Sequence, residues 1–409
     1  MQVVLNRSKI QSENNVIITG SKSESNRALL LKALYPEIKL DNLSNSDDTR
    51  LMARALASQD EEIDIHHAGT AMRFLTAYFS TIENRTTILT GSERMKQRPI
   101  KILVDALSKL GADISYVQNE GYPPLCIKGT LVNGHKTSLK ANVSSQYISA
   151  LLLIAPSLQH GLELTLDGEI TSRPYIKMSL GLLDQIGVDS NFTGNMIKVD
   201  PLKSLSKETT ITIESDWSSA SYFYSIVALS EVGTQLRLSS YSLMSLQGDS
   251  VLAEIYKSFG VFTQFDSNQI TLRKVESYQI DNFKYDLNNA PDIAQTIAVT
   301  CLGLGIGCNL TGLHTLKIKE TDRLEAMKTE LSKFGATVVI TKNSLELKPC
   351  HVLKSEVHID TYNDHRMAMA FAPISLKTTL TINEADVVSK SYPNFWEDLK
   401  QIGITLNYS

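Results

Sequence analysis

The stretch ELSKFGATVVI, residues 330–340, has the pattern of a helix end, a stop at Gly335 and a β-strand. Glycine is common just past a helix because it adopts the left-handed backbone conformation without steric cost. The same pattern recurs in LSKLGADISYV (107–117), LLDQIGVDSNF (182–192), IYKSFGVFTQF (255–265) and LKQIGITLNY (399–408). With a degenerate copy, MARALASQDEEIDI (52–65), the sequence predicts six repeated units of about 70 residues each.

Some of these units also contain a helix that is apolar on nearly every side. Examples are YISALLLIAPSL, DIAQTIAVTCLGLGI and MAMAFAPISL. A helix of this kind is buried in a globular protein, so we expect helices inside, with sheets or other helices around them. This reverses the usual layering of a doubly wound α/β sheet.

Composition limits the class of protein. A chain of 409 residues with 42% hydrophobic and 21% charged residues predicts a soluble globular protein of two or more domains. The net charge of -4 argues against nucleic-acid binding. We see no secretory or transit segment and no apolar run long enough to cross a membrane, so we expect a cytoplasmic protein.

Cysteine and histidine give no sign of a metal site. The cysteines show no CxxC spacing and are expected to be free thiols: Cys126, Cys301, Cys308 and Cys350. His66 and His67 are adjacent and would point apart on most backbones. We therefore expect no metal ion.

Cations gather where helices are predicted to begin. They include Lys22 and Arg27 in GSKSESNRALLL, Arg98 in RMKQRPI, Arg323 in KIKETDRL, Arg366 in NDHRMAM and Lys390 in KSYPNF. The first turn of a helix carries partial positive charge, so a cation there is unfavourable unless an anion is bound nearby. One such turn is ordinarily a solvated charged surface. Because the pattern recurs, it predicts a multiply anionic ligand, without which Arg98, Arg323 and Arg366 are hard to explain.

Ten motifs, in order along nearly the whole chain, resemble those of the 5-enolpyruvylshikimate-3-phosphate synthase family of enolpyruvyl transferases. They are GSKSESNRALLL, SDDTR, AGTAMR, RMKQRPI, VSSQ, SRPYI, QGD, KETDRL, NDHRMAM and KSYPNF. The resemblance implies a two-domain inside-out α/β barrel, in which each domain has three βαβαββ repeats around buried parallel helices. It implies one domain at 21–214, a discontinuous one joining 1–20 to 215–409, and an active site in the cleft between them.

The resemblance also implies the reaction. The enolpyruvyl group of phosphoenolpyruvate passes to the 5-hydroxyl of shikimate 3-phosphate by addition and elimination, with release of phosphate, as a step of the shikimate pathway to aromatic amino acids. The partners would be these small molecules alone, bound by a monomer without metal or organic cofactor, nucleic acid or membrane. Protons must move to and from the enol carbon and the hydroxyl, which suits carboxylates and lysines.

Site residues follow from the matched positions. The resemblance assigns the acid and base roles to Lys22, Asp292 and Glu320. Phosphoenolpyruvate would be bound by Lys22, Gly69, Arg98, Gln146, Arg323, His365, Arg366 and Lys390. Shikimate 3-phosphate would be bound by Lys22, Ser23, Arg27, Ser144, Ser145, Gln146, Ser172, Tyr175, Asp292, Thr315 and Lys319. Arginine suits both substrates because its planar fork binds two oxygens of a carboxylate or phosphate at once.

Several of these residues also have a plain structural interpretation. Ser144, Ser145 and Gln146 could simply cap a helix, Tyr175 could be a packing residue, and Asp292 could be the N-cap after a proline. Capping and ligand binding are compatible, because both use the same helix end.

The chain departs from the family pattern at four positions, which puts fine contacts in doubt. These are His67, Phe74, Thr315 and Ser215. Two other functions stay open. One is the sister transferase acting on UDP-N-acetylglucosamine, which carries a cysteine in the loop that corresponds to TGSERMKQRPI, where this chain has none. The other is a non-catalytic anion-binding protein of the same fold.

Overall fold

The chain divides into two compact units. The computed structural model describes residues 1–409 except 12, 142–143, 169, 171–172, 206 and 279. The continuous unit is Gly20–Ile213, and the discontinuous unit joins Met1–Thr19 to Glu214–Ser409. The domains expected from the sequence are 21–214 and a second one that joins 1–20 to 215–409. That each of them folds independently stays a prediction.

Three inner helices form the centre of the continuous unit. They are α1 (Lys22–Leu34), α3 (Gly69–Ser80) and α6 (Ser145–Ile154). These helices pack against one another, and α3 and α6 are buried along nearly their whole length. Burying these helices removes apolar side chains from water on every helix face, which is why the helices lie inside the unit. The outer helices are α2 (Asp47–Ala57), α4 (Glu93–Lys96), α5 (Lys101–Lys109) and α7 (Arg173–Gln185).

The strands of the continuous unit lie in three sheets. In order across each sheet they are β4 (Glu62–Asp64), β5 (Thr86–Thr90), β7 (Leu125–Lys128) and β6 (Asp113–Tyr116); β10 (Ser190–Thr193), β11 (Met196–Val199), β9 (Leu162–Asp167) and β8 (Lys136–Lys140); and β12 (Thr209–Thr212) with β3 (Ile38–Asp41). The pairs β4–β5 and β8–β9 are parallel, and each is extended by antiparallel strands. Helices α3 and α6 supply the crossovers that parallel pairing requires.

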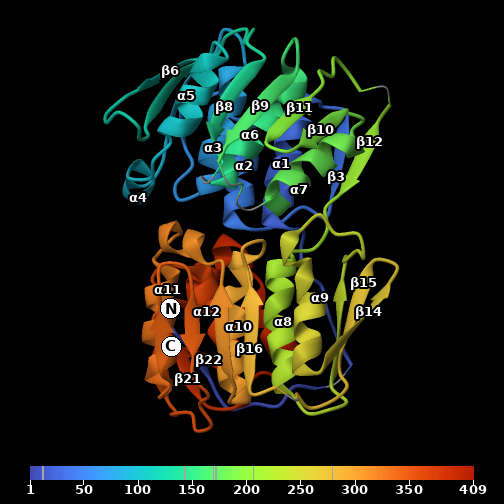
Figure 1. Cartoon of the computed structure of the whole chain (residues 1–409), viewed down its shortest axis with the longest axis vertical. Coiled ribbons are helices and arrows are strands. Elements are labelled where there is room, and N and C mark those ends of the chain that lie inside the picture. The colour runs from blue at the N-terminus through green and yellow to red at the C-terminus, as the bar shows by residue number, and fades with distance from the viewer. Residues whose placement is uncertain (12, 142–143, 169, 171–172, 206, 279) are drawn as a thin grey trace. The chain divides into compact units, whose positions relative to one another are not determined.

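The discontinuous unit repeats this plan. Its inner helices are α8 (Trp217–Leu229), α10 (Ala294–Leu304) and α12 (His365–Phe371), and α10 packs against both of the others (Figure 1). One hydrophobic core includes side chains from all three. The other helices and 3-10 turns are η2 (Gly248–Val251), α9 (Leu252–Ile255), η3 (Tyr256–Phe259), η4 (Pro291–Ile293), η5 (His314–Ile318), α11 (Arg323–Lys333), η6 (Ala372–Leu376), η7 (Ala385–Lys390) and α13 (Phe395–Gln401).

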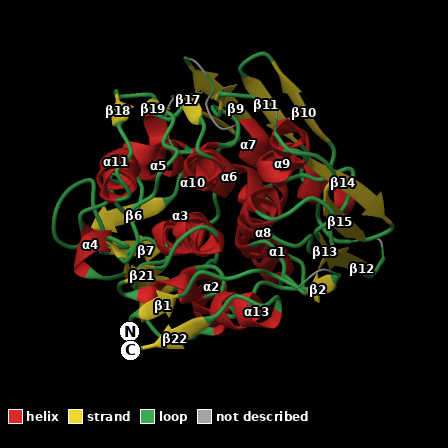
Figure 2. Cartoon of the chain, turned by 90° about the horizontal axis from the view of Figure 1, so that it is seen from below, coloured by secondary structure: helices red, strands yellow, loops and turns green. Residues whose placement is uncertain are grey.

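The N-terminal segment completes two sheets of the discontinuous unit. The three sheets contain, in order, β14 (Val261–Asp266), β15 (Gln269–Lys274), β13 (Gln235–Ser239) and β2 (Asn14–Val16); β16 (Asn282–Asp286), β17 (Gly307–Thr311), β19 (Leu345–Leu347) and β18 (Val338–Ile340); and β20 (Val357–Ile359), β21 (Leu380–Ile382), β1 (Val3–Leu5) and β22 (Leu406–Tyr408). Strand β2 pairs with β13, and β1 lies between β21 and β22 (Figure 2).

The predicted α/β class is confirmed, and so is the repeated helix stop. A left-handed glycine follows the outer helix at each of five places: Gly111, Gly187, Gly260, Gly335 and Gly403. The degenerate copy ends differently, because α2 stops at the extended residue Ser58. The inner helices are buried on nearly every side, which explains why their sequences are apolar throughout. The outer helices are buried on one face, which explains why only one face of each is apolar.

Two of these glycines predict different costs on substitution. At Gly335 (φ +96°) an added Cβ meets nothing closer than Lys354 Cε at 3.7 Å, whereas at Gly260 (φ +75°) it would lie 2.0 Å from the carbonyl oxygen of Glu276. We expect Gly335→Ala to cost about 1 kcal/mol of unfolding free energy from backbone strain alone. Gly260→Ala should cost more, because the backbone must also move. Denaturant unfolding of the two variants measures this difference, and equal losses would contradict it.

Candidate active site

Buried charges gather where helices of the discontinuous unit begin. Arg323 is the first residue of α11, and its side chain is 2% exposed. Its Nε lies 2.6 Å from Asp364 Oδ2, and its Nη1 lies 2.8 Å from Asp292 Oδ1. Its Nη2 donates to Glu320 Oε2 at 2.9 Å. One guanidinium therefore holds three carboxylates from different parts of the chain.

These contacts explain Arg323 without a bound anion. Burial alone would lower the pKa of its guanidinium, but the carboxylates, Asp364 foremost, raise that pKa above its ordinary value. Buried charges are tolerated when they are paired in this way. Its burial is accounted for by these partners, and its role in binding an anion stays a prediction. Asp322 is the N-cap of α11, because its Oδ1 accepts the backbone N–H of Leu324 at 3.1 Å.

Asp292 lies among cations. It sits in the short turn η4, which begins at Pro291, and its side chain is 9% exposed. In addition to the contact with Arg323, its Oδ1 lies 3.2 Å from Lys319 Nζ, and its Oδ2 lies 3.6 Å from Arg366 Nη2. Asp292 is not the N-cap that the structural interpretation offered, since the turn has no side-chain cap. Three cations therefore lie within 3.6 Å of this carboxylate.

Arg366 is the more accessible of the two arginines, with 12% of its side chain exposed. It is the second residue of α12, and its Nη2 donates to Ser218 Oγ at 3.2 Å. Within the part of the chain that the structure describes, Ser218 and Asp292 are the only side chains within hydrogen-bond or ion-pair distance of its guanidinium. Burial lowers its pKa and Asp292 raises it, and the net shift is well upward.

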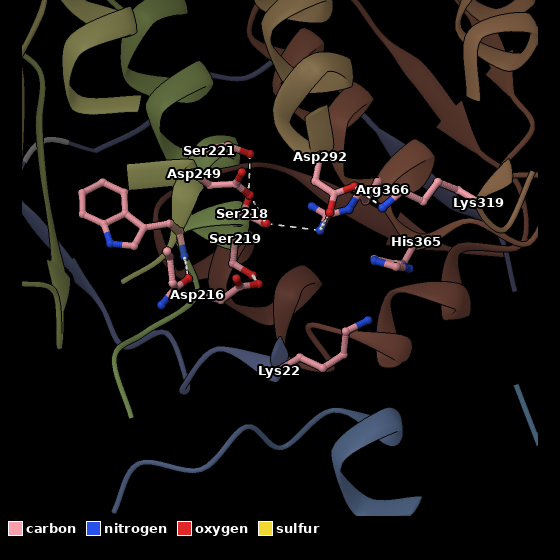
Figure 3. A network of polar contacts seen from close by, with 12 residues as sticks. Lys22, Asp216, Ser218, Ser219, Ser221, Asp249, Asp292, Lys319, His365 and Arg366 are labelled. Atoms are coloured by element: carbon pink, nitrogen blue, oxygen red, sulfur yellow. Dashed lines mark hydrogen bonds and ion pairs between the residues drawn. The ribbon is translucent and has the colours of Figure 1, made fainter. Parts of the chain in front are cut away.

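A further carboxyl, Asp249, lies behind this arginine (Figure 3). It accepts a hydrogen bond from Ser218 Oγ, and the residue is 6% exposed. Burial first, and then the negative charge of Asp292, raise the pKa of Asp249 to about 6. Arg366 and the Ser218 hydroxyl act in the opposite direction. The Asp249 carboxyl is thus charged at neutral pH, and burial of this charge costs free energy.

Three other predicted residues lie near these elements. His365 is the buried first residue of α12, and its Nδ1 lies 3.9 Å from Asp364 Oδ1. Lys390 ends η7, and its Nζ donates to the carbonyl oxygen of Asn363 at 2.7 Å. Thr315 lies in η5, and its buried Oγ1 has no hydrogen-bond partner among the described residues. Among the described residues, no hydrogen bond or ion pair joins the side chain of Lys390 or Thr315 to Asp292.

In the continuous unit, Lys22 forms an ion pair at the start of α1. Its Nζ lies 3.2 Å from Asp48 Oδ2, and His67 Nε2 lies 3.5 Å from the other oxygen of the same carboxylate. The Asp48 side chain is 10% exposed and that of Lys22 is 19% exposed. His67, one of the departures from the family pattern, therefore contacts the partner of a predicted catalytic lysine.

Gly69, the first residue of α3, lies next to the Arg98 guanidinium. A Cβ added at Gly69 would lie 2.5 Å from Arg98 Nη1, so any larger residue would displace that guanidinium. Arg73, which the repeated cation pattern also includes, is buried in α3, and burial followed by the charge of Arg98 lowers its pKa to about 10. Gln146 Nε2 donates to Thr70 Oγ1 at 3.0 Å, which joins α6 to α3.

Arg27 is more deeply buried than a surface ligand-binding residue. It is 2% exposed, its Nε donates to Ser179 Oγ at 2.9 Å and its Nη1 to the carbonyl oxygen of Ser23 at 2.6 Å. Its Nη2 donates to Ser149 Oγ at 2.9 Å, and the Tyr175 ring lies 5.8 Å from its Cζ. Burial lowers its pKa to about 10. Arg27 thus ties together α1, α6 and α7.

The hydroxyl-rich start of α6 is capped as the structural interpretation proposed. Ser144 is the N-cap, and its side chain accepts from the backbone N–H of Gln146 at 3.4 Å. Ser145 is the first helical residue and is partly exposed. Ser172 lies outside the described residues.

Sequence reasoning passed over several acidic and hydroxyl residues of both units. These are Asp48, Ser218, Asp249 and Asp364. Three of them stand inside motifs that carried the resemblance, SDDTR, QGD and NDHRMAM. The acids that balance the cations of these motifs are as informative as the cations themselves.

The described residues contain no group of three or more histidine, cysteine or acidic side chains arranged to hold a metal ion. No described helix has both the length and the apolar character needed to span a bilayer. All four cysteines are free.

The architecture defines the class of protein by its fold, which is the α/β fold of the enolpyruvyl transferases. Two solved structures share this fold over 100% of the chain. One is EPSP synthase from Acinetobacter baumannii, with a TM-score of 0.82, 20% identity and 99% of that chain covered. The other is the enolpyruvyl transferase NikO from Streptomyces tendae, with a TM-score of 0.77, 13% identity and 98% of that chain covered.

Sequence comparison identifies the family. Residues 54–399 match the family described as EPSP synthase (3-phosphoshikimate 1-carboxyvinyltransferase). The 3-phosphoshikimate 1-carboxyvinyltransferase of Bacteroides fragilis is 47% identical over 96% of this chain and 96% of its own length. The chain belongs to the EPSP synthase family, and the shikimate-pathway reaction is favoured over that of the sister transferase.

Asp249 predicts a pH dependence of stability. Because its pKa rises from an ordinary 3.8 in the unfolded chain to about 6 in the folded protein, its contribution to stability falls as pH rises from about 4 to about 6. Asp249→Asn does not titrate and keeps an acceptor oxygen for Ser218. We expect its unfolding temperature to rise relative to that of the parent protein across this pH range, by an amount equivalent to at most about 3 kcal/mol. A difference that is constant from pH 4 to pH 8 would contradict this.

Proposed function

We propose that Lys22, Asp292 and Glu320 carry the proton transfers of enolpyruvyl transfer from phosphoenolpyruvate to shikimate 3-phosphate. In the addition step an acid protonates C3 of the enol while a base takes the proton of the attacking 5-hydroxyl. In the elimination step a proton leaves the same carbon and phosphate departs. Groups that serve in both directions must be able to hold and release a proton in one place.

The carboxylates around Arg323 support this assignment. Glu320 is the most exposed of them, with 32% of its side chain accessible compared with 9% for Asp292 and 0% for Asp364. A substrate can therefore reach Glu320 and one edge of Asp292, whereas the buried Asp364 holds Arg323 and caps α12. The same guanidinium orients Glu320 and Asp292, which gives the two carboxylates a fixed geometry.

We assign the phosphoenolpyruvate-binding role to cations and a close-approach glycine. They are Lys22, Gly69, Arg98, Gln146, Arg323, His365, Arg366 and Lys390. Arg323 has five N–H groups, and one on Nη1 is not used by the described residues. Arg366 offers more, because a single hydrogen bond to Ser218 occupies its guanidinium.

We assign the shikimate 3-phosphate-binding role mainly to the continuous unit. The residues are Lys22, Ser23, Arg27, Ser144, Ser145, Gln146, Ser172 and Tyr175, with Asp292, Thr315 and Lys319 from the discontinuous unit. The start of α6 places two serine hydroxyls at the positive end of a helix, which suits phosphate oxygens. Groups of both units would then act on one pair of substrates. A cytoplasmic monomer that needs no cofactor completes the proposal.

The observation that carries this proposal is the cluster of Asp292 with three cations, Lys319, Arg323 and Arg366. Such a cluster suits a carboxylate that must stay close to anionic substrates without repelling them. The three cations offset the negative charge of the carboxylate and that of the substrates.

Phosphate release from phosphoenolpyruvate tests the reaction. We expect release when shikimate 3-phosphate is the acceptor and none when UDP-N-acetylglucosamine is. Release with UDP-N-acetylglucosamine alone would assign the chain to the sister reaction. No release with either, from protein that still binds shikimate 3-phosphate in calorimetry, would indicate a binding protein that has lost its chemistry.

Glu320→Gln tests the proton-transfer role. The amide keeps the size of the side chain and can still accept from Arg323, but it cannot exchange a proton. We expect turnover to fall by about 100-fold or more, with the KM of both substrates within threefold of the parent value. Loss of substrate binding in calorimetry, instead of loss of turnover, would make Glu320 a structural residue.

A further inference from the structure

The motif QGD, residues 247–249, has no role in the assignments above, yet both of its polar side chains contact the start of α8. Gln247 Oε1 accepts the backbone N–H of Trp217 at 3.0 Å, and its Nε2 donates to the carbonyl oxygen of Ser215 at 3.0 Å. Asp249 accepts from the hydroxyl of Ser218, which is the second residue of the helix. The motif therefore fixes the backbone and one side chain of this helix start.

Ser218 connects Asp249 to Arg366 (Figure 3). A serine hydroxyl has one proton to donate and two lone pairs to accept with. Because the proton of Ser218 points to Asp249, a lone pair of Oγ is left to accept from Arg366 Nη2 at 3.2 Å. The contact is directional, because reversing the hydroxyl would set its proton against an N–H group.

We propose that Asp249 and Ser218 are positioning residues for Arg366, and that they hold its guanidinium in the orientation that binds phosphoenolpyruvate. The proposal rests on the assignment of Arg366 to phosphoenolpyruvate. Neither residue needs to touch the substrate, since each acts through the arginine. Ser218 is 7% exposed and Asp249 is 6% exposed, as expected of a support that lies behind the binding residue.

Arg366 depends on this support more than Arg323 does. Three carboxylates contact the Arg323 guanidinium at 2.6 to 2.9 Å, whereas the nearest carboxylate to the Arg366 guanidinium among the described residues, Asp292, lies 3.6 Å away. The hydrogen bond to Ser218 is thus the shorter of the two contacts that orient the Arg366 guanidinium. A long side chain that is already fixed loses less conformational freedom when a ligand binds.

Steady-state kinetics of Ser218→Ala tests the proposal. We expect the KM for phosphoenolpyruvate to rise about tenfold, with the KM for shikimate 3-phosphate within about twofold of the parent value. Ser218→Thr keeps the hydroxyl and should recover most of the lost affinity. Ser221→Ala is the matched control. It removes a buried hydroxyl from the same helix, where Ser221 contacts Thr296 and the carbonyl oxygen of Ser218 but neither Arg366 nor Asp249.

Asp249 is tested by a pair of variants. Asp249→Ala leaves the Ser218 hydroxyl free to turn and should raise the KM for phosphoenolpyruvate, whereas Asp249→Asn keeps an acceptor oxygen and should have the smaller effect. Combining Ser218→Ala with Asp249→Ala should raise this KM no further than Ser218→Ala alone, because both act through one chain of contacts. If the increases in this KM from Ser218→Ala and Asp249→Ala multiply in the double variant, the two residues act independently and the proposal is wrong.

Arg366→Lys separates this proposal from the assignment on which it rests. If Arg366→Lys raises the KM for phosphoenolpyruvate and Ser218→Ala behaves like Ser221→Ala, Arg366 binds the substrate without the proposed support, and the proposal is wrong. If neither changes that KM, the assignment of Arg366 fails as well. An equal rise in both KM values, together with a lower unfolding temperature, would make Ser218 a general structural residue.

Discussion

The interaction on which the discontinuous unit's charged site depends is the burial of one guanidinium among three carboxylates. Arg323 joins Glu320, Asp292 and Asp364, which come from the turn before α11, from η4 and from the residue before α12. Such a buried ionic cluster adds little net stability, but the loss of one member leaves an uncompensated charge inside the protein. Its effect is geometric, because it fixes two accessible carboxylates with respect to each other.

The inner helices explain why charges gather at these places. A helix that is buried on every side can bear hydroxyls along its length where they are paired, as Ser221 and Thr296 are, but a charged side chain there would lie in the core. In the discontinuous unit, Asp216 and Ser218 occupy the start of α8, and His365 and Arg366 the start of α12. The charged residues of these two helices therefore lie at the helix starts, where unpaired N–H groups also require partners, and contacts between the starts build the network around Arg366.

Much of this fold can be predicted from the sequence because the repeats contain residues that mark where their helices end. The glycine at each of five helix ends, and the apolar patterns of α6, α10 and α12, follow from local backbone and burial physics. Partners in space were harder to predict. For Arg323, nothing local in the sequence indicates that Asp364 and Asp292, both distant in sequence, lie against it. Asp48, Ser218 and Asp249 were missed for the same reason, since their partners are set by tertiary packing.

Strand β1 has a consequence for how the chain is made. It lies between β21 and β22, and Gln2 exchanges backbone hydrogen bonds with Ser409, so the earliest strand to be synthesised is completed by one of the latest. At ribosomal rates of about 5 to 20 residues per second, β1 waits on the order of tens of seconds for its neighbours. The residues of the continuous unit are all made during that wait. Biosynthesis therefore imposes an order in which the uninterrupted half of the molecule can be finished before the half that encloses it in sequence.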